Sequence, residues 1–393
     1  MMRTYSAGRV HTGDGRVFAP GKVMVDGQGT ILSAATAAGE SWDPDYLGEG
    51  TVLCPGFINA HTHLELSWMH GRIEKGLGLD HFIRSVAALR REIPVEAIRQ
   101  AAMQSALNEM LVSGTVAAGD IANGLSGLEL KREKEIRWHT FIELFGSHEG
   151  EAEDHFRRGM ELRAAFRDMG DSSLVPHAPY SVSVPLLDRI LAQAGAEQAI
   201  LSMHHQENPA ETEYYLHGSG PVALRLEDMG IPLPPAFPAG RRPLEFILSR
   251  MPVARRLLLV HNTYATAEDM EAARGSATPL SWVLCPRANL YIEGRLPDVE
   301  LLMQKGAEIA LGTDSLASND DLSMVQEMKV LQAHFPWLTL DTLIPWATLH
   351  GARALGMEQE LGSLQPGKRP GLLCLDGIVD GRIGAGTRIR RLG

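Results

Sequence analysis

Short apolar runs recur through the central part of this chain, and each is followed by a longer segment with helical spacing. This alternation is typical of βα units that build a parallel sheet. The runs are CPGFINAHTH, GTVAAGDI, IRWHTFIELFG, SSLVPHAPYS, AILSMHHQE, RLLLVHNTYA, PLSWVLCPRA and AEIALGTDS. Eight units in roughly 250 residues or a little more have the size of a closed barrel. We therefore expect an α/β protein with a (β/α)8 TIM-type barrel over residues 55–360.

An open doubly wound sheet is the alternative fold for the same alternation. It would carry a glycine-rich phosphate loop after the first strand, and the chain continues there with LELSWMHG instead. Two connections are longer than simple turns. We expect residues 65–85 to form a loop over a pocket and residues 218–243 to form a semi-rigid lid, although a purely connective role fits the second equally well.

The two ends of the chain have a different pattern. Residues 1–54 alternate short β-prone pieces with Gly, Asp and Pro turns, and residues 361–393 do the same. Such a pattern is typical of small antiparallel sheets. We expect the two ends to pair into one small composite β domain outside the barrel.

Composition and charge limit the classes of partner that the protein is expected to bind. The 393 residues, 44% of them hydrophobic, are enough for one large core and a smaller unit. A formal net charge of −11 without long Lys/Arg clusters argues against nucleic acid and anionic membranes, so a small-molecule substrate is expected. Three widely spaced cysteines fit neither a disulfide framework nor a Cys-based zinc site. With no apolar signal region and no long apolar stretch, we expect a cytoplasmic protein.

Two histidines, His61 and His63, end the first apolar run. On a strand, residues i and i+2 point to the same face, so both side chains can bind one metal ion. By itself the pair is a weak signal, because short motifs of this kind also occur as hydrogen-bonded core or surface histidines.

Other runs end in side chains of the same chemistry. His204 and His205 both end the fifth run, and consecutive strand residues point to opposite faces, so the local pattern leaves open which one faces inward. His261 ends the sixth run and Asp314 follows the eighth. A buried carboxylate needs a partner, which a cation would supply; capping of the following turn is the alternative. Histidines with one carboxylate are typical of catalytic rather than structural metal sites.

The motifs HTHLELS, HAPYSVS, HxxE, HN and TDSLASND occur in this order, and the chain resembles the amidohydrolase superfamily, specifically its nucleoside and nucleobase deaminase branch. The resemblance extends over the whole chain, including the small sheet from both ends. It implies a barrel that binds one zinc ion, or iron in some members. In the family the ligand stands three residues before a glutamate, and Glu207 therefore selects His204 over His205. The implied ligands are His61, His63, His204 and Asp314.

The resemblance also implies a mechanism. Binuclear members carry a carboxylated lysine on the fourth strand, whereas this chain has His177 and no lysine there, so we expect a single ion. The ion would lower the pKa of a water molecule to about 7. Glu207 would then carry a proton from that water to a ring nitrogen of the substrate. Asp314 would accept the remaining proton, and His261 would stabilise the developing charge.

Within the branch, HTHLELS and CPRANLYIEGRLPD look most like aminodeoxyfutalosine deaminases and deaminases of S-adenosylhomocysteine or methylthioadenosine. We therefore expect hydrolytic release of ammonia from a 6-aminopurine nucleoside. The alternatives on this scaffold are a pterin, guanine or cytosine deaminase and a triazine-type chlorohydrolase. A non-catalytic assembly protein is disfavoured because every implied ligand is present. The oligomeric state is left open, although barrels of this kind often form homo-oligomers.

The residues that contact the non-reacting part of the substrate are less well defined by the sequence. The candidate contacts are His177, Glu143, Trp68, Met69 and Arg295. Trp68 and Met69 fit ordinary packing as well, and Arg295 equally fits a solvated loop charge. A futalosine-type substrate carries a benzoate, for which Arg72, Arg287 and Arg295 are candidate partners.

Overall fold

Eight parallel strands form the centre of the computed structural model, which describes residues 2–37, 46–92, 94–132, 135–231, 237 and 240–392. They are β7 (Phe57–Thr62), β8 (Thr115–Ala122), β9 (Arg137–Leu144), β10 (Asp171–Pro176), β11 (Ile200–His205), β12 (Arg256–His261), β13 (Leu280–Leu284) and β14 (Ile309–Leu311). Each coincides with one of the apolar runs of the sequence, and only β8 and β10 extend beyond their run, by one residue each. The pairing forms two four-stranded parallel sheets, β7 to β10 and β11 to β14.

The two sheets close into one barrel through backbone hydrogen bonds at their neighbouring edges. Between β10 and β11, the amide of His204 donates to the carbonyl of His177 at 2.9 Å. Between β14 and β7, the amide of Thr313 donates to the carbonyl of His61 at 3.1 Å, and Thr62 forms a parallel bridge with Asp314. The expected (β/α)8 barrel is therefore confirmed.

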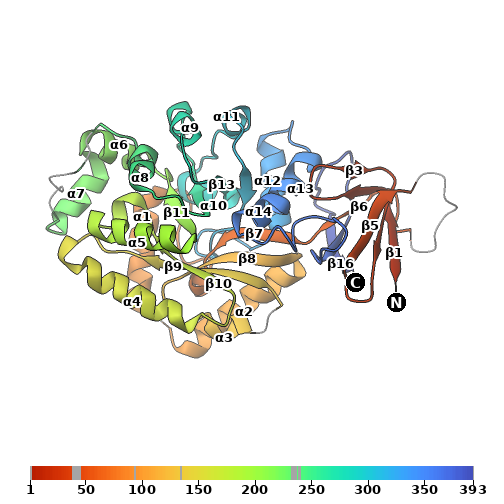
Figure 1. Ribbon diagram of the computed structural model, residues 1–393, viewed down its shortest axis with the longest axis horizontal. Helices are drawn as coiled ribbons and strands as arrows, with labels where there is room; N and C mark the ends of the chain where they lie inside the picture. Colours follow the sequence, from red (N-terminus) through yellow and green to blue (C-terminus); the bar gives the residue numbers. More distant parts are fainter. Residues whose placement is uncertain are drawn as a thin grey trace.

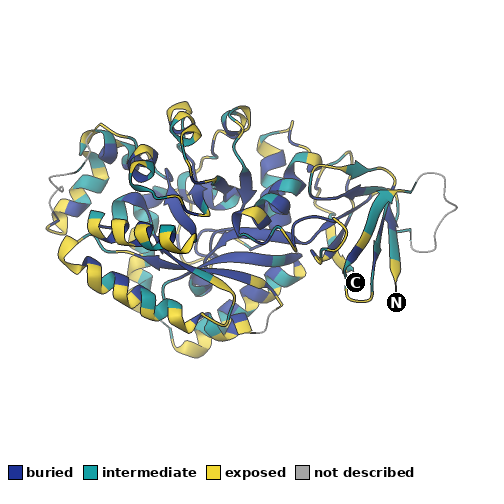
Figure 2. Cartoon of the chain, viewed as in Figure 1, coloured by how far each residue is buried: buried dark blue, intermediate teal, exposed yellow. Residues whose placement is uncertain are grey.

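Helices cover the outside of the barrel, and the strands they enclose are almost entirely buried (Figure 2). The helices are α1 (Gly78–Leu89), α2 (Glu96–Val112), α3 (Leu128–Arg132), α4 (Ala152–Ala165), α5 (Val184–Glu197), α6 (Pro209–His217), α7 (Gly220–Asp228), α8 (Pro243–Arg250), α9 (Ala267–Arg274), α10 (Pro286–Glu293), α11 (Val299–Gln304), α12 (Met324–His334), α13 (Leu340–Ala347) and α14 (Leu349–Ala354). None of these described helices is long and apolar enough to cross a membrane.

Helix α5 illustrates how the sequence specifies this layer. It has a proline in its first turn, where a missing N–H is tolerated, and it ends at Gln198, which adopts a left-handed φ of 51°. Its buried residues recur along one face and pack into the main core, and they include Leu187, Ile190 and Leu191. The opposite face of the helix is exposed to solvent.

The two ends of the chain form a smaller β unit beside the barrel, where both termini lie (Figure 1). Strand β6 (Thr51–Pro55) pairs antiparallel with β15 (Leu372–Asp376), with Cys54 opposite Leu373. The full order of this sheet is β16 (Arg388–Leu392), β15, β6, β2 (Arg9–His11) and β3 (Val17–Phe18). A second sheet contains β1 (Arg3–Ala7), β4 (Gly21–Val25) and β5 (Ile31–Thr36). The expected small sheet from both ends is confirmed, and the domain boundaries at 54/55 and 360/361 stay predictions.

The prediction of a loop over residues 65–85 is wrong. A 3-10 helix, η1 (Leu64–Met69), follows β7 directly, and α1 begins at Gly78. The glycines of this stretch occupy the turn between the two helices, where Gly71 and Gly76 have positive φ values of 69° and 76°. Within residues 218–243, α7 and the start of α8 are helical, whereas residues 232–236 and 238–239 of the proposed lid lie outside the described residues.

A buried ion pair fixes the chain where it leaves β7. Asp120 of β8 accepts a hydrogen bond from the amide of Leu64 at 2.9 Å, and its other oxygen lies 2.6 Å from Nζ of Lys131. The side chains of Asp120 and Lys131 are 1% and 0% exposed. A pair so fully removed from water leaves an uncompensated charge if one partner is lost.

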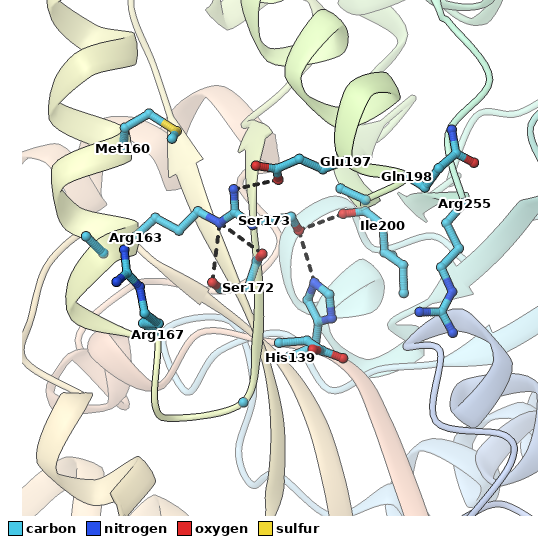
Figure 3. Close-up of a pocket in the computed structure, with 14 residues that line it drawn as sticks. His139, Met160, Arg163, Arg167, Ser172, Ser173, Glu197, Gln198, Ile200 and Arg255 are labelled. Atoms are coloured by element: carbon cyan, nitrogen blue, oxygen red, sulfur yellow. Dashed lines mark hydrogen bonds and ion pairs between the residues drawn. The ribbon is translucent and has the colours of Figure 1, made fainter.

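A cavity of about 550 Å³ lies at the amino ends of β9, β10 and β11 (Figure 3). Arg163 of α4 is bonded there to Glu197 at 2.7 Å and to the carbonyl of Ser172 at 3.0 Å. His139 lies at this end of the barrel and bonds through Nε2 to the hydroxyl of Ser173 at 3.0 Å. This end of a TIM-type barrel serves stability rather than catalysis.

We predict that Lys131→Met lowers the free energy of unfolding by about 3–5 kcal/mol, because Asp120 would remain buried without its partner. Urea unfolding measures the change. Arg137→Met is the control, since Arg137 forms an exposed ion pair with Glu360 at 2.7 Å and should cost about 0–1 kcal/mol. Equal losses in the two variants would contradict the importance assigned to the buried pair.

A second prediction concerns pH. Burial, followed by the charges of Arg255 and Arg163, lowers the pKa of His139 from 6.5 to about 3. The folded protein keeps this ring neutral while the unfolded chain protonates it below pH 6.5, so its contribution is complete above that pH and decreases towards pH 3. We expect the stability difference between the protein and His139→Gln to narrow by about 2 kcal/mol between pH 7.5 and pH 5. A difference independent of pH in urea unfolding would contradict this.

Candidate metal centre and catalytic cavity

Five side chains converge where the barrel strands end. His61 lies within β7 and His63 follows the strand, His204 lies near the end of β11, His261 ends β12, and Asp314 follows β14. All five are buried, with exposed fractions between 0% for His61 and 8% for His63 and His204. Their convergence follows from the fold, since the carboxyl ends of all parallel strands meet at one end of the barrel.

The donor atoms lie close enough to surround one ion. Nε2 of His61 is 3.0 Å from Nε2 of His63, and Oδ1 of Asp314 is 3.4 Å from Nε2 of His63 and 3.7 Å from Nε2 of His61. Ligands about 2.0–2.1 Å from a tetrahedral zinc ion are themselves roughly 3.3 Å apart. His204 and His261 each fall within 4.8 Å of two members of this group. The described residues therefore fit a divalent cation.

The structure distinguishes His204 from its neighbour His205. The ring of His204 faces the cluster, with its centroid 5.0 Å from that of His61. Its Nδ1 is 2.9 Å from the carbonyl of His177, which leaves Nε2 for a metal. His205 points away from the cluster and pairs through Nδ1 with Oδ1 of Asn262 at 3.0 Å. The geometry agrees with His204 as the inward residue.

The backbone at two of these positions is strained. Asp314 has a φ of 56° and His261 a φ of 75°, both in the left-handed region that residues with a Cβ rarely adopt. Asp314 is held there by its bridge to Thr62, and its Oδ2 accepts a hydrogen bond from the hydroxyl of Ser318. Strain of this kind persists where surrounding contacts impose it, and it is concentrated at functional sites.

Burial controls the charge of the cluster. It lowers the pKa of His61 and His261, and it lowers the pKa of His63 and His204 well below the ordinary value of 6.5. Burial alone would raise the pKa of Asp314, but the nearby histidines, His61 first, bring it below its usual range. Neutral imidazoles and an ionised carboxylate are the forms that bind a metal ion.

Glu207 lies beside this cluster, and its pKa is shifted upward rather than downward. Its Oε1 is 3.7 Å from Nε2 of His261. Burial raises the pKa of Glu207 well above 4.5, and the negative charges of Asp314 and Glu293 add to the effect. A raised pKa makes a carboxylate a stronger base, which suits it to proton transfer.

A cavity of about 260 Å³ opens onto the cluster. Of the sequence candidates for substrate contacts, His177 and Glu143 line it. Nδ1 of His177 pairs with the hydroxyl of Ser181 at 2.9 Å, and burial lowers its pKa to about 3. Burial likewise raises the pKa of Glu143 to about 7. The metal-side lining residues are His63, His204, Glu207, His261 and Asp314.

Other candidates lie elsewhere among the described residues. Met69 is fully buried in a small cluster with Leu66 and Ile73, and Trp68 packs against the same cluster. Arg295 lies over the ring of Tyr264, 4.8 Å from its centroid. None of the three lines the cavity as described.

The arginines proposed from the sequence as benzoate partners also lie outside it. Arg72 is 3.6 Å from Glu92, and Arg287 pairs with Asp321. The arginines that line the cavity are Arg90 and Arg225, which sequence reasoning missed. The signal for Arg90 was the amphipathic pattern of α1, which the preceding glycines hid; Arg225 lies on α7.

Comparisons with known proteins agree with this geometry. The family model for the amidohydrolase family matches residues 52–386. The chain belongs to the amidohydrolase family.

This amidohydrolase is 28% identical over 342 residues to the 5-methylthioadenosine/S-adenosylhomocysteine deaminase of Teredinibacter turnerae, covering 83% of the chain and 72% of the relative. Among solved structures, it resembles the aminofutalosine deaminase of Helicobacter pylori in complex with methylthio-coformycin (TM-score 0.79, 23% identity, 97% of this chain and 93% of that one). It also resembles an adenosine deaminase of Xanthomonas campestris with bound zinc (TM-score 0.71, 24% identity, 95% and 84%). At 23% and 24% identity, the likeness to these two structures shows the fold alone.

We predict that His204→Asn weakens zinc binding by at least about 100-fold. Loss of a residue that only hydrogen-bonds a metal ligand already lowers metal affinity by about 10–100-fold, and loss of a ligand should cost at least as much. His205→Asn is the matched control, one residue away and facing outward, and it should retain the metal. Metal content after dialysis against a graded chelator, read by mass spectrometry, compares the two. Loss of metal in His205→Asn with retention in His204→Asn would reverse the assignment.

Proposed function

We propose that this amidohydrolase is a metal-dependent deaminase that releases ammonia from a 6-aminopurine nucleoside. The observation that carries the proposal is the position of Glu207, a buried carboxyl group with a raised pKa beside a cluster of metal-binding side chains at the end of a small cavity. The names of the relatives, which are deaminases of methylthioadenosine, S-adenosylhomocysteine, aminofutalosine and adenosine, support the same substrate class.

Zinc is the proposed metal. Nitrogen and oxygen donors without cysteine are the ligands of catalytic zinc, and the Xanthomonas campestris relative is described with zinc bound. A zinc ion supplies one thing to the reaction, namely a bound water with a pKa of about 7. The proposed ligands are His61, His63, His204 and Asp314.

Glu207 is the proposed proton carrier. It would take a proton from the attacking water and give it to the ring nitrogen next to the amino-bearing carbon, which makes that carbon more electrophilic. The raised pKa of Glu207 matches this task, because a carboxylate with an ordinary pKa is a weaker base at neutral pH.

His261 and Asp314 would act on the attacking oxygen. Nδ1 of the neutral His261 ring donates to the amide oxygen of Asn289, so Nε2 carries a lone pair and would accept a hydrogen bond from the attacking water. The ring is oriented for this by Asn289, whose Oδ1 lies 3.4 Å from Nδ1 of His261. Asp314, whose pKa is lowered, stays ionised and would accept the remaining proton of the attacking oxygen. Asp314 would then pass that proton to the amino group of the substrate, so that ammonia leaves and the carboxylate is restored.

His177 and Glu143 would bind the purine. His177 uses Nδ1 for Ser181, so its Nε2 remains for the substrate. Glu143 is anchored by the side-chain amide of Asn123 at 3.0 Å and, with a pKa of about 7, offers both a donor and an acceptor. This pairing of donors and acceptors suits a heteroaromatic base with alternating ring nitrogens.

A cytoplasmic location is also proposed. Cys54, Cys285 and Cys374 are unpaired and buried, which fits a reducing compartment.

We predict that Glu207→Gln lowers kcat for ammonia release by about 10²- to 10⁴-fold while zinc content is unchanged, because the variant removes the proton carrier and no ligand. The assay is ammonia release by the zinc-loaded protein from adenosine, methylthioadenosine, S-adenosylhomocysteine, guanine and a pterin. Undiminished turnover in Glu207→Gln would exclude its assigned role. Turnover of guanine or pterin alone would reject the nucleoside as substrate.

A further inference from the structure

The residue that precedes Glu207 has a strained backbone. Gln206 follows the last residue of β11, is fully buried, and has a φ of 45°. A residue with a Cβ rarely adopts this left-handed conformation, so surrounding contacts must impose it. The direction in which the chain continues to Glu207 depends on this φ.

Two hydrogen bonds hold Gln206 in that conformation. Its amide donates to Oε2 of Glu211 at 2.8 Å, and its carbonyl accepts from the amide of Tyr264 at 2.9 Å. Fixing both the N–H and the C=O of one residue fixes the two dihedral angles between them. The bond from Tyr264 is made by the backbone, whereas the bond to Glu211 requires a particular side chain.

Glu211 reaches the amide of Gln206 from the first turn of α6. Asn208 is the N-cap of this helix, which makes Glu211 its third residue. A glutamate at the third position usually accepts a hydrogen bond from the amide of the N-cap residue itself. Here it reaches two residues farther back, while the cap is provided by Oδ1 of Asn208, which accepts from the amide of Ala210 at 2.9 Å. The contact therefore serves the chain before the helix.

Glu211 lies outside the catalytic cavity. It is 2% exposed, and among the described residues its Oε1 has no hydrogen-bond partner. It is not one of the residues that line the cavity. A buried carboxyl group with one unsatisfied oxygen is unfavourable compared with an apolar side chain. What the group contributes is therefore the bond that Oε2 makes.

We propose that Glu211 is a positioning residue for Glu207. By holding the amide of Gln206, it keeps the backbone left-handed there and directs Glu207 to the metal cluster, where Oε1 of Glu207 lies 3.7 Å from Nε2 of His261. Without this bond Gln206 would relax to a negative φ, and the carboxyl group of Glu207 would move from its place. The inference rests on the proposed function, in which Glu207 carries the proton.

A direct effect of the charge of Glu211 is the competing explanation. Burial raises the pKa of Glu211 well above 4.5, against the opposing effect of the hydrogen bond from Gln206, and so favours the neutral carboxyl group. The charges that raise the pKa of Glu207 are those of Asp314 and Glu293. Glu211 is thus expected to act as a neutral acceptor, which the amide oxygen of a glutamine can replace.

The test measures kcat and KM of zinc-loaded variants with adenosine, methylthioadenosine and S-adenosylhomocysteine. We expect Glu211→Met, which removes the acceptor, to lower kcat by about 10- to 100-fold, because a displacement of about 1 Å can cost 10²-fold in rate. KM and zinc content should change little, since Glu207 acts in the transition state and is not a ligand. Glu211→Gln keeps the acceptor and should restore most of kcat.

Two further variants serve as controls. Glu211→Asp keeps the carboxyl group but is shorter by one methylene group, so it should show the same fall in kcat and can be measured if Glu211→Met does not fold. Glu213→Met changes an exposed glutamate of the same helix, whose Oε1 is 3.3 Å from the hydroxyl of Ser219, and should leave kcat unchanged.

Several outcomes would overturn the inference. An equal loss of kcat in Glu211→Gln and in Glu211→Met or Glu211→Asp would show that the acceptor is not what matters. Loss of zinc together with kcat would show that Glu211 supports His204 rather than Glu207. Full kcat in Glu211→Met or Glu211→Asp would exclude the positioning role and leave the proposed function intact. If the unaltered protein deaminates none of the nucleosides, the proposed function fails and this inference fails with it.

Discussion

The structure depends on a group of buried nitrogen and oxygen atoms whose lone pairs converge at the carboxyl end of the barrel. Nitrogen and oxygen atoms of His61, His63 and Asp314 lie 3.0–3.7 Å apart with almost no exposure to water. Water cannot solvate donors packed so closely, and in the described cluster one cation could satisfy them all. The barrel brings them together by closing β14 onto β7, so the same backbone bonds that complete the fold also assemble the site.

The two ends of the barrel have different roles. At the carboxyl end, Asp314 and His261 accept unfavourable backbone conformations, and their strain is balanced by contacts such as the one from Ser318. At the amino end, Arg163 and Glu197 neutralise each other, and the described residues form no group there that could bind a metal. The larger cavity is thus at the end without the chemistry, and cavity volume alone would have located the site wrongly.

The strands and the convergent donors could be predicted from the sequence because both depend on local patterns, namely an apolar run and the polar residue that ends it. The choice between His204 and His205 could not be predicted from the local pattern. Alternation along a strand shows that the two side chains point to opposite faces, but not which one points inward. That choice required the resemblance to a family. Helix α1 was missed because the glycines that precede it indicate a loop. The role of its apolar face depends on the cavity that it lines, which the sequence does not show. Arg90 was missed for the same reason, because its place in the cavity depends on where α1 ends in the fold.

Environment, rather than residue type, separates the two carboxyl groups at the centre of the site. Glu207 and Asp314 have similar chemistry in water. Burial raises the pKa of Glu207, whereas contact with His61 and His63 outweighs burial for Asp314 and lowers its pKa. The ionised Asp314 also acts on Glu207, because its negative charge is one of the causes that raise the pKa of Glu207. A base and an acid can therefore coexist in one dry cavity at the same pH, which is the condition that hydrolysis with proton transfer to the leaving group requires.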